Sequence, residues 1–195
     1  MYAIVVLNSL ILSPTRYTTR DFVNMVDSDT QHDNPRWKEN VTLTYEEHMR
    51  NQYSEAIDLA KELERKLGKE KAREIIGELY LRKFTEWAEN LQKEYTINSI
   101  EDFAEMNSHI FESSRSHIME VTEVTPTSYR ETDTSCIFAK MCRDLDAAEL
   151  GYVMFCATDF PLARIFHPRM RLERTKTLMQ GDDCCDFHYT LVDDK

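Results

Sequence analysis

The chain has 195 residues, of which 35 are acidic and 24 are basic, so its formal net charge is −11. With 42% hydrophobic residues, four glycines and five prolines, it can bury a core and is too poor in loop-forming residues to be a disordered or linker protein. The acidic excess argues against a nucleic acid or an anionic membrane surface as partner, because both attract Lys and Arg.

Residues 1–43 are predicted to form an N-terminal arm whose order the sequence leaves open. Met1–Leu12 is apolar but is interrupted by polar residues and is too short to cross a bilayer, so a buried strand, a short helix and a signal peptide are the alternatives. Residues 13–43 are polar and show no sustained periodicity. Residues 44–195 should form a single domain, because no stretch rich in Pro or Gly divides them.

Two amphipathic helices are predicted at the start of this domain. Thr44 to Glu47 have the T-x-x-E form of a capping box, so the first helix should begin there. Apolar residues then recur at steps of three and four as far as Leu67, and Gly68 supplies a left-handed residue that ends the helix. A second apolar stripe runs over 72–95. Because the turn is short, the two helices should pack as an antiparallel hairpin.

A third helix and a pair of strands are predicted next. The helix should begin at Ser99, which is followed by acidic residues in the first turn. Over 117–124 and 127–134, β-branched and aromatic residues alternate with charged ones, which is typical of strands. Pro126 lies between the two segments as a turn residue. The sequence therefore predicts two adjacent antiparallel strands.

The last third of the chain predicts two short helices and a closing hairpin. Helical spacing returns over 137–145 and again over 150–165, where Pro161 should bend or break the second helix. Residues 170–179 and 184–191 then flank a turn that contains Gly and paired Asp residues.

The closing hairpin has two candidate registers. A three-residue turn sets Met179 opposite Cys185 and brings Glu173 and Thr177 to the same face as Cys185. A two-residue turn instead sets Leu178 opposite Cys185 and leaves the other two residues on the far face. The first register gathers polar groups beneath the preceding helix, which would form a cavity with a few convergent polar groups.

Helices and strands occur in runs instead of alternating singly. This order is typical of an α+β fold, with an antiparallel sheet of about four strands covered by helices and an N-terminal helical hairpin. The apolar residues of the hairpin are compatible with a homo-oligomer.

Five cysteines lie in the last third of the chain. Their odd number cannot complete a set of intramolecular disulfides, so a reducing compartment, the cytoplasm, is the simpler expectation. A free cysteine is most often a buried packing residue, and we expect this of Cys142 and Cys184. Cys136 should begin a helix whose N–H groups would favour its thiolate. Cys156 and Asp159 share one helix face, from which both could reach a metal or a substrate.

Four segments of this region form a recognisable combination. They are Cys136 before a short helix, a Cys-x-x-Asp at 156–159, an Arg-x-x-Thr-Leu at 174–178 and a Gly-x-x-x-Cys-Asp-Phe at 181–187. Together they resemble the L-2-amino-thiazoline-4-carboxylic acid hydrolase family, most clearly over 131–191.

This resemblance implies a hydrolase that opens a small cyclic amidine, a 2-aminothiazoline carboxylate, by hydrolysis of a C–N bond toward a carbamoyl-cysteine product. Such chemistry needs an activated water or a thiolate to attack the ring carbon C2. The implied roles are Cys156 or Cys185 as nucleophile or metal ligand, and Asp159 as amidine partner or base. Arg174 would hold the substrate carboxylate, with Thr177 and Glu173 completing the substrate-binding set.

The Gly-x-x-x-Cys-x-Phe ending also resembles sensor domains of the vinyl-4-reductase type. In those domains the matching cysteine helps to bind zinc or lies near a small aromatic ligand. A divalent metal held by Cys136, Cys156 and Cys185 is therefore a candidate cofactor, although Thr177 stands where a second hairpin cysteine would be expected. The alternative function is a non-enzymatic domain that senses a small molecule or a metal.

Overall fold

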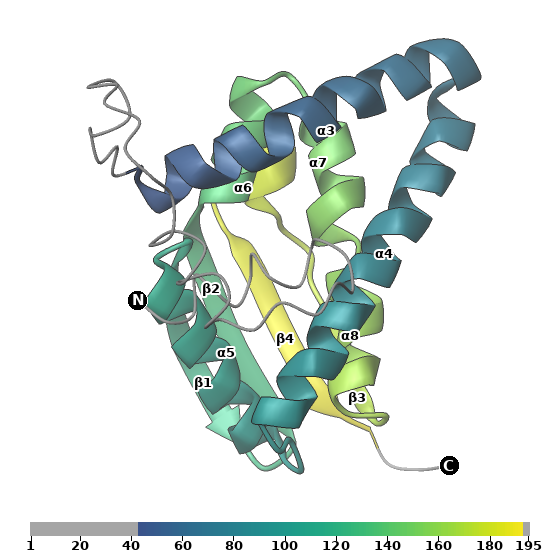
Figure 1. Ribbon diagram of the computed structural model, residues 1–195. Helices are drawn as coiled ribbons and strands as arrows, with labels where there is room; N and C mark the ends of the chain where they lie inside the picture. The colour runs from purple at the N-terminus through teal and green to yellow at the C-terminus, as the bar shows by residue number, and fades with distance from the viewer. Residues whose placement is uncertain (1–42, 193–195) are drawn as a thin grey trace, which may run out of the picture. The chain divides into compact units, whose positions relative to one another are not determined.

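The computed structural model describes residues 43–192, so the predictions for the N-terminal arm lie outside the described residues apart from its last position (Figure 1). The fold is α+β, with a four-stranded antiparallel sheet and an N-terminal helical region, as predicted. That 44–195 form a single domain stays a prediction. The main elements are α3 (Tyr45–Leu67), α4 (Lys69–Glu94), α5 (Ile100–Ser114), β1 (His117–Thr125), β2 (Ser128–Cys136), α6 (Ile137–Asp144), α7 (Ala148–Gly151), η2 (Tyr152–Cys156), α8 (Asp159–Phe166), β3 (Met170–Glu173), η3 (Leu178–Gln180) and β4 (Cys185–Leu191).

Helices α3 and α5 begin where the sequence predicts, and α3 also ends there. Helix α3 begins directly after Thr44 and ends at Leu67, and Gly68 adopts a φ of 82°. A positive φ of this size is readily available only to glycine, which explains why the chain turns here. Helix α5 begins at the predicted position, where Ser99 and Asp102 form a reciprocal capping box.

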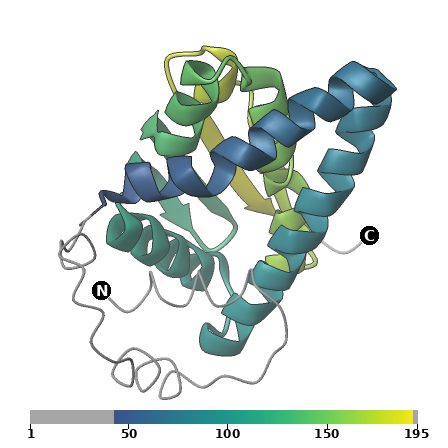
Figure 2. The same cartoon turned by 45° about the horizontal axis from the view of Figure 1, so that its top comes forward.

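Helices α3 and α4 are joined at Gly68 and contribute to one core cluster, as the predicted helical hairpin requires. They meet at Gly68 and then diverge (Figures 1 and 2). Ile57 of α3 and Tyr80 of α4 belong to one core cluster with Leu150 and Met154 of the α7–η2 segment. The apolar stripes of both helices therefore face a third element as well as each other, which holds them apart.

The break in the helix after Leu150 comes earlier than predicted. It consists of the π-helical segment η2, which ends at Cys156, and a short turn before α8 begins at Asp159. Pro161 is the third residue of α8, where its missing N–H would have no helical acceptor, so it does not interrupt the helix. A π-helical turn is wider than an α-helical one and is often found at functional sites.

The sheet has the strand order β1-β2-β4-β3. Neither predicted register of the closing hairpin is correct, because Glu173 lies opposite His188. The intervening segment is a loop and not a tight turn. The Asp186 carboxylate accepts hydrogen bonds from the backbone N–H of Thr175 at 2.8 Å and of Lys176 at 2.6 Å. The Asp186 carboxylate thus replaces the backbone acceptors that a longer β3 would have used, and this explains why β3 ends at Glu173.

Strand alternation places one face of β2 and β4 beneath the helices. Tyr129, Glu131 and Asp133 of β2 are all buried, and so are Cys185 and Tyr189 of β4. Two acidic residues therefore belong to the interior face of the sheet. None of the helices within 43–192 has the length and apolarity needed to span a membrane.

Gly151 is expected to be intolerant of a side chain, because α7 there lies against α6 and η3. A Cβ atom at this position would be 2.7 Å from the Cys142 Sγ and 2.7 Å from the Met179 Sδ. Gly151→Ala should therefore lower the free energy of unfolding by about 1–3 kcal/mol, measured by urea denaturation. Gly77→Ala in α4 is the control, since its Cβ would meet the nearest atom, Val153 Cγ1, at 3.4 Å. That substitution should be neutral or stabilising, and equal losses in both variants would contradict the argument.

Candidate functional site

Three thiols lie close together where β2, η2 and β4 end or begin. Cys136 caps α6, and its Sγ accepts a hydrogen bond from the backbone N–H of Ala139 at 3.5 Å. Cys156 ends η2, and Cys185 begins β4. The Thr177 Oγ1 joins the last two, at 3.9 Å from the Cys156 Sγ and 3.7 Å from the Cys185 Sγ.

The thiols are neutral near pH 7. Burial raises the pKa of Cys136 to about 12, and it also raises the pKa of Cys156 and of Cys185 above the usual value. The helix N–H groups act on Cys136 in the predicted direction and lower its pKa, but the loss of hydration outweighs them, so the thiol stays protonated. A nucleophilic thiol at this site would need a neighbouring base.

An ion pair joins the start of α8 to the loop after β3. Arg174 Nη1 donates to Asp159 Oδ2 at 2.6 Å, and Arg174 Nη2 donates to the backbone carbonyl of Cys156 at 2.9 Å. The Arg174 side chain is 2% exposed, whereas that of Asp159 is 31% exposed. The guanidinium also lies 5.0 Å from the ring centroid of Phe187 and 5.2 Å from that of Phe160. Through these hydrogen bonds and ring contacts, Arg174 holds the junction between η2 and α8 in place.

Two carboxyl groups that the sequence reasoning did not single out face this ion pair from β2. Burial raises the pKa of Glu131 to about 7. Hydrogen bonds from the Tyr129 hydroxyl and the Asn107 amide lower this pKa, but they offset only part of the effect of burial. Burial, with the nearby charges of Glu131 and Asp159, raises the pKa of Asp133 to about 8. Both residues follow Tyr129 at steps of two along β2, so their side chains lie on the same buried face of the strand. This alternation is the sequence signal that would have indicated their burial.

His117 lies beside Asp133 without neutralising it. Its Nε2 is 4.0 Å from the Asp133 Oδ2, and its Nδ1 is 2.9 Å from the Ser116 Oγ. Burial lowers the pKa of His117 to about 4, so the imidazole is uncharged near pH 7.

The structure brings together most of the residues that the sequence proposed. Cys156, Asp159, Arg174, Thr177 and Cys185 form one connected group through the contacts given above. Glu173 does not join this group. Its side chain is 79% exposed, and its Oε2 lies 3.8 Å from the Nδ1 of His188.

The remaining cysteines lie apart from this group. Cys142 is fully buried and belongs to the core around Ile57, as a packing residue would. Cys184 lies in the loop before β4, where its Sγ contacts the Asp183 carboxylate.

The predicted metal set does not fit a metal site as the side chains are arranged. Within 43–192, no group of three or more His, Cys, Asp or Glu side chains is placed to hold a metal ion. The Thr177 hydroxyl occupies the position between Cys156 and Cys185. We therefore derive no chemical step through a metal.

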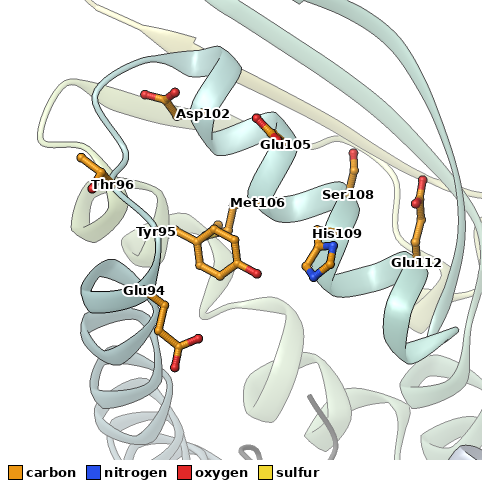
Figure 3. A pocket seen from close by; sticks show the side chains of 9 residues that line it. All are labelled: Glu94, Tyr95, Thr96, Asp102, Glu105, Met106, Ser108, His109 and Glu112. Carbon is orange, nitrogen blue, oxygen red and sulfur yellow. The ribbon is translucent and has the colours of Figure 1, made fainter. Parts of the chain in front are cut away.

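A separate cleft of about 540 Å³ lies beside the end of α4 and along α5 (Figure 3). In this view Tyr95 and His109 point toward each other, and their ring centroids are 6.3 Å apart. None of the residues that the sequence proposed for the site lines this cleft. Its lining residues are Glu94, Tyr95, Thr96, Asp102, Glu105, Met106, Ser108, His109 and Glu112.

Comparison with known proteins identifies a family and a structural neighbour. The sequence model described as L-2-amino-thiazoline-4-carboxylic acid hydrolase matches residues 46–189. Among curated proteins, none matches the sequence. One of the solved structures that match this chain is the phenol-responsive sensory domain of the transcription activator PoxR with phenol. It is 11% identical, with a TM-score of 0.48, and the match covers 91% of this chain and 92% of that one.

Proposed function

This chain belongs to the L-2-amino-thiazoline-4-carboxylic acid hydrolase family, whose match extends over most of its length, and we propose that it hydrolyses a C–N bond in a small cyclic amidine. The observation that supports this most is the group formed by Cys156, Thr177 and the Asp159–Arg174 pair. It unites a thiol, a hydroxyl, a carboxylate and a guanidinium at the junction of η2 and α8, where the Asp159 side chain reaches solvent.

Cys156 is the better candidate nucleophile of the two thiols beside Thr177. The Cys185 Sγ accepts a hydrogen bond from the backbone N–H of Leu178 at 3.2 Å, and Cys185 is 6% exposed. Cys156 is partly exposed and lies three residues before Asp159, whose charge is close enough to raise its pKa. In this proposal Cys185 positions the loop, and Cys156 meets the substrate.

The proposed reaction consumes one water. The Asp159 carboxylate accepts the proton of Cys156 as the sulfur adds to the ring carbon C2. The bond between C2 and the ring nitrogen then breaks, and that nitrogen leaves as an amine after taking up the proton. Water then adds to C2, and the bond between C2 and the Cys156 sulfur breaks while the substrate sulfur stays on C2. A proton from the water restores the Cys156 thiol, and a carbamoyl group remains on the product.

Arg174 would serve this reaction as a positioning residue as well as a clamp. Its two hydrogen bonds hold the Cys156 carbonyl and the Asp159 carboxylate in fixed relation, so nucleophile and base keep their geometry. A substrate carboxylate entering beside Asp159 would meet the same guanidinium, as the resemblance implies.

The test is turnover of 2-aminothiazoline-4-carboxylate by purified protein, followed by product chromatography and by mass spectrometry of the protein. Cys156→Ala should lower kcat by about 10³-fold or more, because it removes the attacking atom. Cys184→Ala, which changes a thiol outside the site, is the matched control and should keep wild-type activity. Wild-type protein quenched during turnover should carry an adduct on the peptide that contains Cys156.

Full activity of Cys156→Ala would contradict the nucleophile assignment. Binding of the amidine by wild-type protein without any turnover would contradict the hydrolase and support the alternative, a domain that senses a small molecule. The neutral state of all three thiols is the observation that favours this alternative, since no nucleophile is ionised before a ligand binds.

A further inference from the structure

Asp133 has an unpartnered oxygen in the interior of the protein. Its side chain is 7% exposed, and its Oδ1 is a buried side-chain oxygen with no hydrogen-bond partner among the described residues. A buried carboxyl oxygen without a donor is unfavourable, and in native proteins it usually indicates a missing partner. The Asp133 Oδ1 therefore has an unused capacity to accept a hydrogen bond, which none of the described residues fills.

Glu131, two residues earlier on β2, is held in place by neutral donors. Its Oε2 accepts hydrogen bonds from the Asn107 Nδ2 at 2.9 Å and from the Tyr129 hydroxyl. Neither donor carries a charge. Glu131 and Asp133 are therefore two carboxyl groups on one face of one strand, and neither forms an ion pair with a Lys or Arg among the described residues.

The groups that face Asp133 from the surrounding elements do not supply a free cation. His117 of β1 is neutral, and Cys185 of β4 is a neutral thiol in the register position opposite Asp133. Asp159 of α8 adds a further negative charge, and Arg174 already donates to Asp159 and to a backbone carbonyl. Burial, together with the negative charges of Glu131 and Asp159, raises the pKa of Asp133, and the charge of Arg174 offsets this only in part.

We propose that Asp133, with Glu131 beside it, is the receptor for the amidinium group of the substrate and makes the site select cationic cyclic amidines. This inference rests on the proposed function, since it names the part of the substrate that these two residues bind. An amidinium is planar and carries parallel N–H donors, which match the two oxygens of a carboxylate. An amidinium brings a positive charge that holds Asp133 in its ionised form, whereas a neutral analogue with a carbonyl in place of the amidine brings no charge and a single N–H donor, so it binds this pair of carboxyl groups less tightly.

The experiment measures binding by titration calorimetry in the Cys156→Ala background, so that turnover does not interfere. The probes are 2-amino-2-thiazoline, a cationic cyclic amidine, and thiazolidin-2-one, its neutral carbonyl analogue. Protein with Asp133 intact should bind the amidine at least about tenfold more tightly than the carbonyl analogue. Adding Asp133→Asn should remove this preference. Glu120→Gln, which changes an exposed acid on β1, is the matched control and should keep the preference.

Equal binding of both probes with Asp133 intact would overturn the inference without the need for any variant. An unchanged preference in the Asp133→Asn protein would also overturn it. These outcomes are distinct from failure of the hydrolase proposal, which is measured by turnover with Cys156 present. A protein that prefers the amidine but never opens the ring would support the role of Asp133 and contradict the hydrolase proposal.

Discussion

Arg174→Met is expected to lower the free energy of unfolding by about 3 kcal/mol, near the lower end of the effect of breaking a buried ion pair. The Arg174 side chain is 2% exposed, and its removal takes away the donor to Asp159 Oδ2 and to the Cys156 carbonyl. The lower end applies because Asp159 is 31% exposed and can recover part of its hydration. Loss of the stacking on Phe160 and Phe187 adds to the effect. Urea denaturation monitored by tryptophan fluorescence measures it.

The control for this substitution is Arg130→Met on the exposed face of β2. Arg130 is 49% exposed, and its Nε lies 3.6 Å from the Glu123 carboxylate, so its removal should change stability by less than about 0.5 kcal/mol. A double-mutant cycle with Asp159→Asn separates the ion pair from the packing, since the doubly substituted protein no longer contains a buried unpaired charge. If Arg174→Met is as mild as Arg130→Met, Arg174 does not stabilise the η2–α8 junction.

Much of the fold could be predicted because local signals agree with the tertiary structure. The capping residues Thr44 and Ser99 and the left-handed Gly68 mark helix ends that the structure keeps. These signals act through backbone hydrogen bonds of neighbouring residues, so they need no knowledge of the rest of the chain. The positions of α3, α4 and α5 follow from them.

The features that were missed depend on contacts between distant segments. The closing hairpin lost its predicted register because Asp182 and Asp186 accept hydrogen bonds from the loop backbone, which residue spacing alone does not reveal. The helix break moved away from Pro161 because α8 begins only two residues before it. Local turn chemistry was therefore recognised, but its place in the three-dimensional structure was not.

The site was predicted in part for the same reason. Cys156 and Asp159 are close in sequence, and their meeting with Arg174, Thr177 and Cys185 did not require the correct register. Glu131 and Asp133 were overlooked because acidic residues in a strand are usually placed toward solvent.

Their burial has a physical consequence for the whole molecule. A buried carboxyl group without a cation lowers stability whenever it ionises, and a protein keeps such a group where it serves a function. The acid excess around Arg174 should therefore be visible in the pH dependence of folding, independently of any substrate.

Asp133→Asn is expected to be more stable than the wild-type protein at pH 8 by about 5 kcal/mol, with the difference falling below about 1 kcal/mol near pH 4. The pKa of Asp133 is raised from 3.8 to about 8 in the folded protein, so between these values the native state holds a proton that the unfolded state has lost. The native state then binds more protons, and the contribution of this group to stability falls as pH rises through that window. Below pH 3.8 the group is protonated in both states, and the amide is its neutral counterpart.

The measurement is urea denaturation of both proteins at several pH values between 4 and 8, read as the difference in the free energy of unfolding. Taking the difference removes the opposing contributions of the exposed acids, whose effects are the same in both proteins. Glu120→Gln should give a difference that does not change with pH, because an exposed carboxylate is hydrated in both states. A flat profile for Asp133→Asn would mean that this carboxyl is ionised across the range, in which case it would already have a cationic partner within the folded chain.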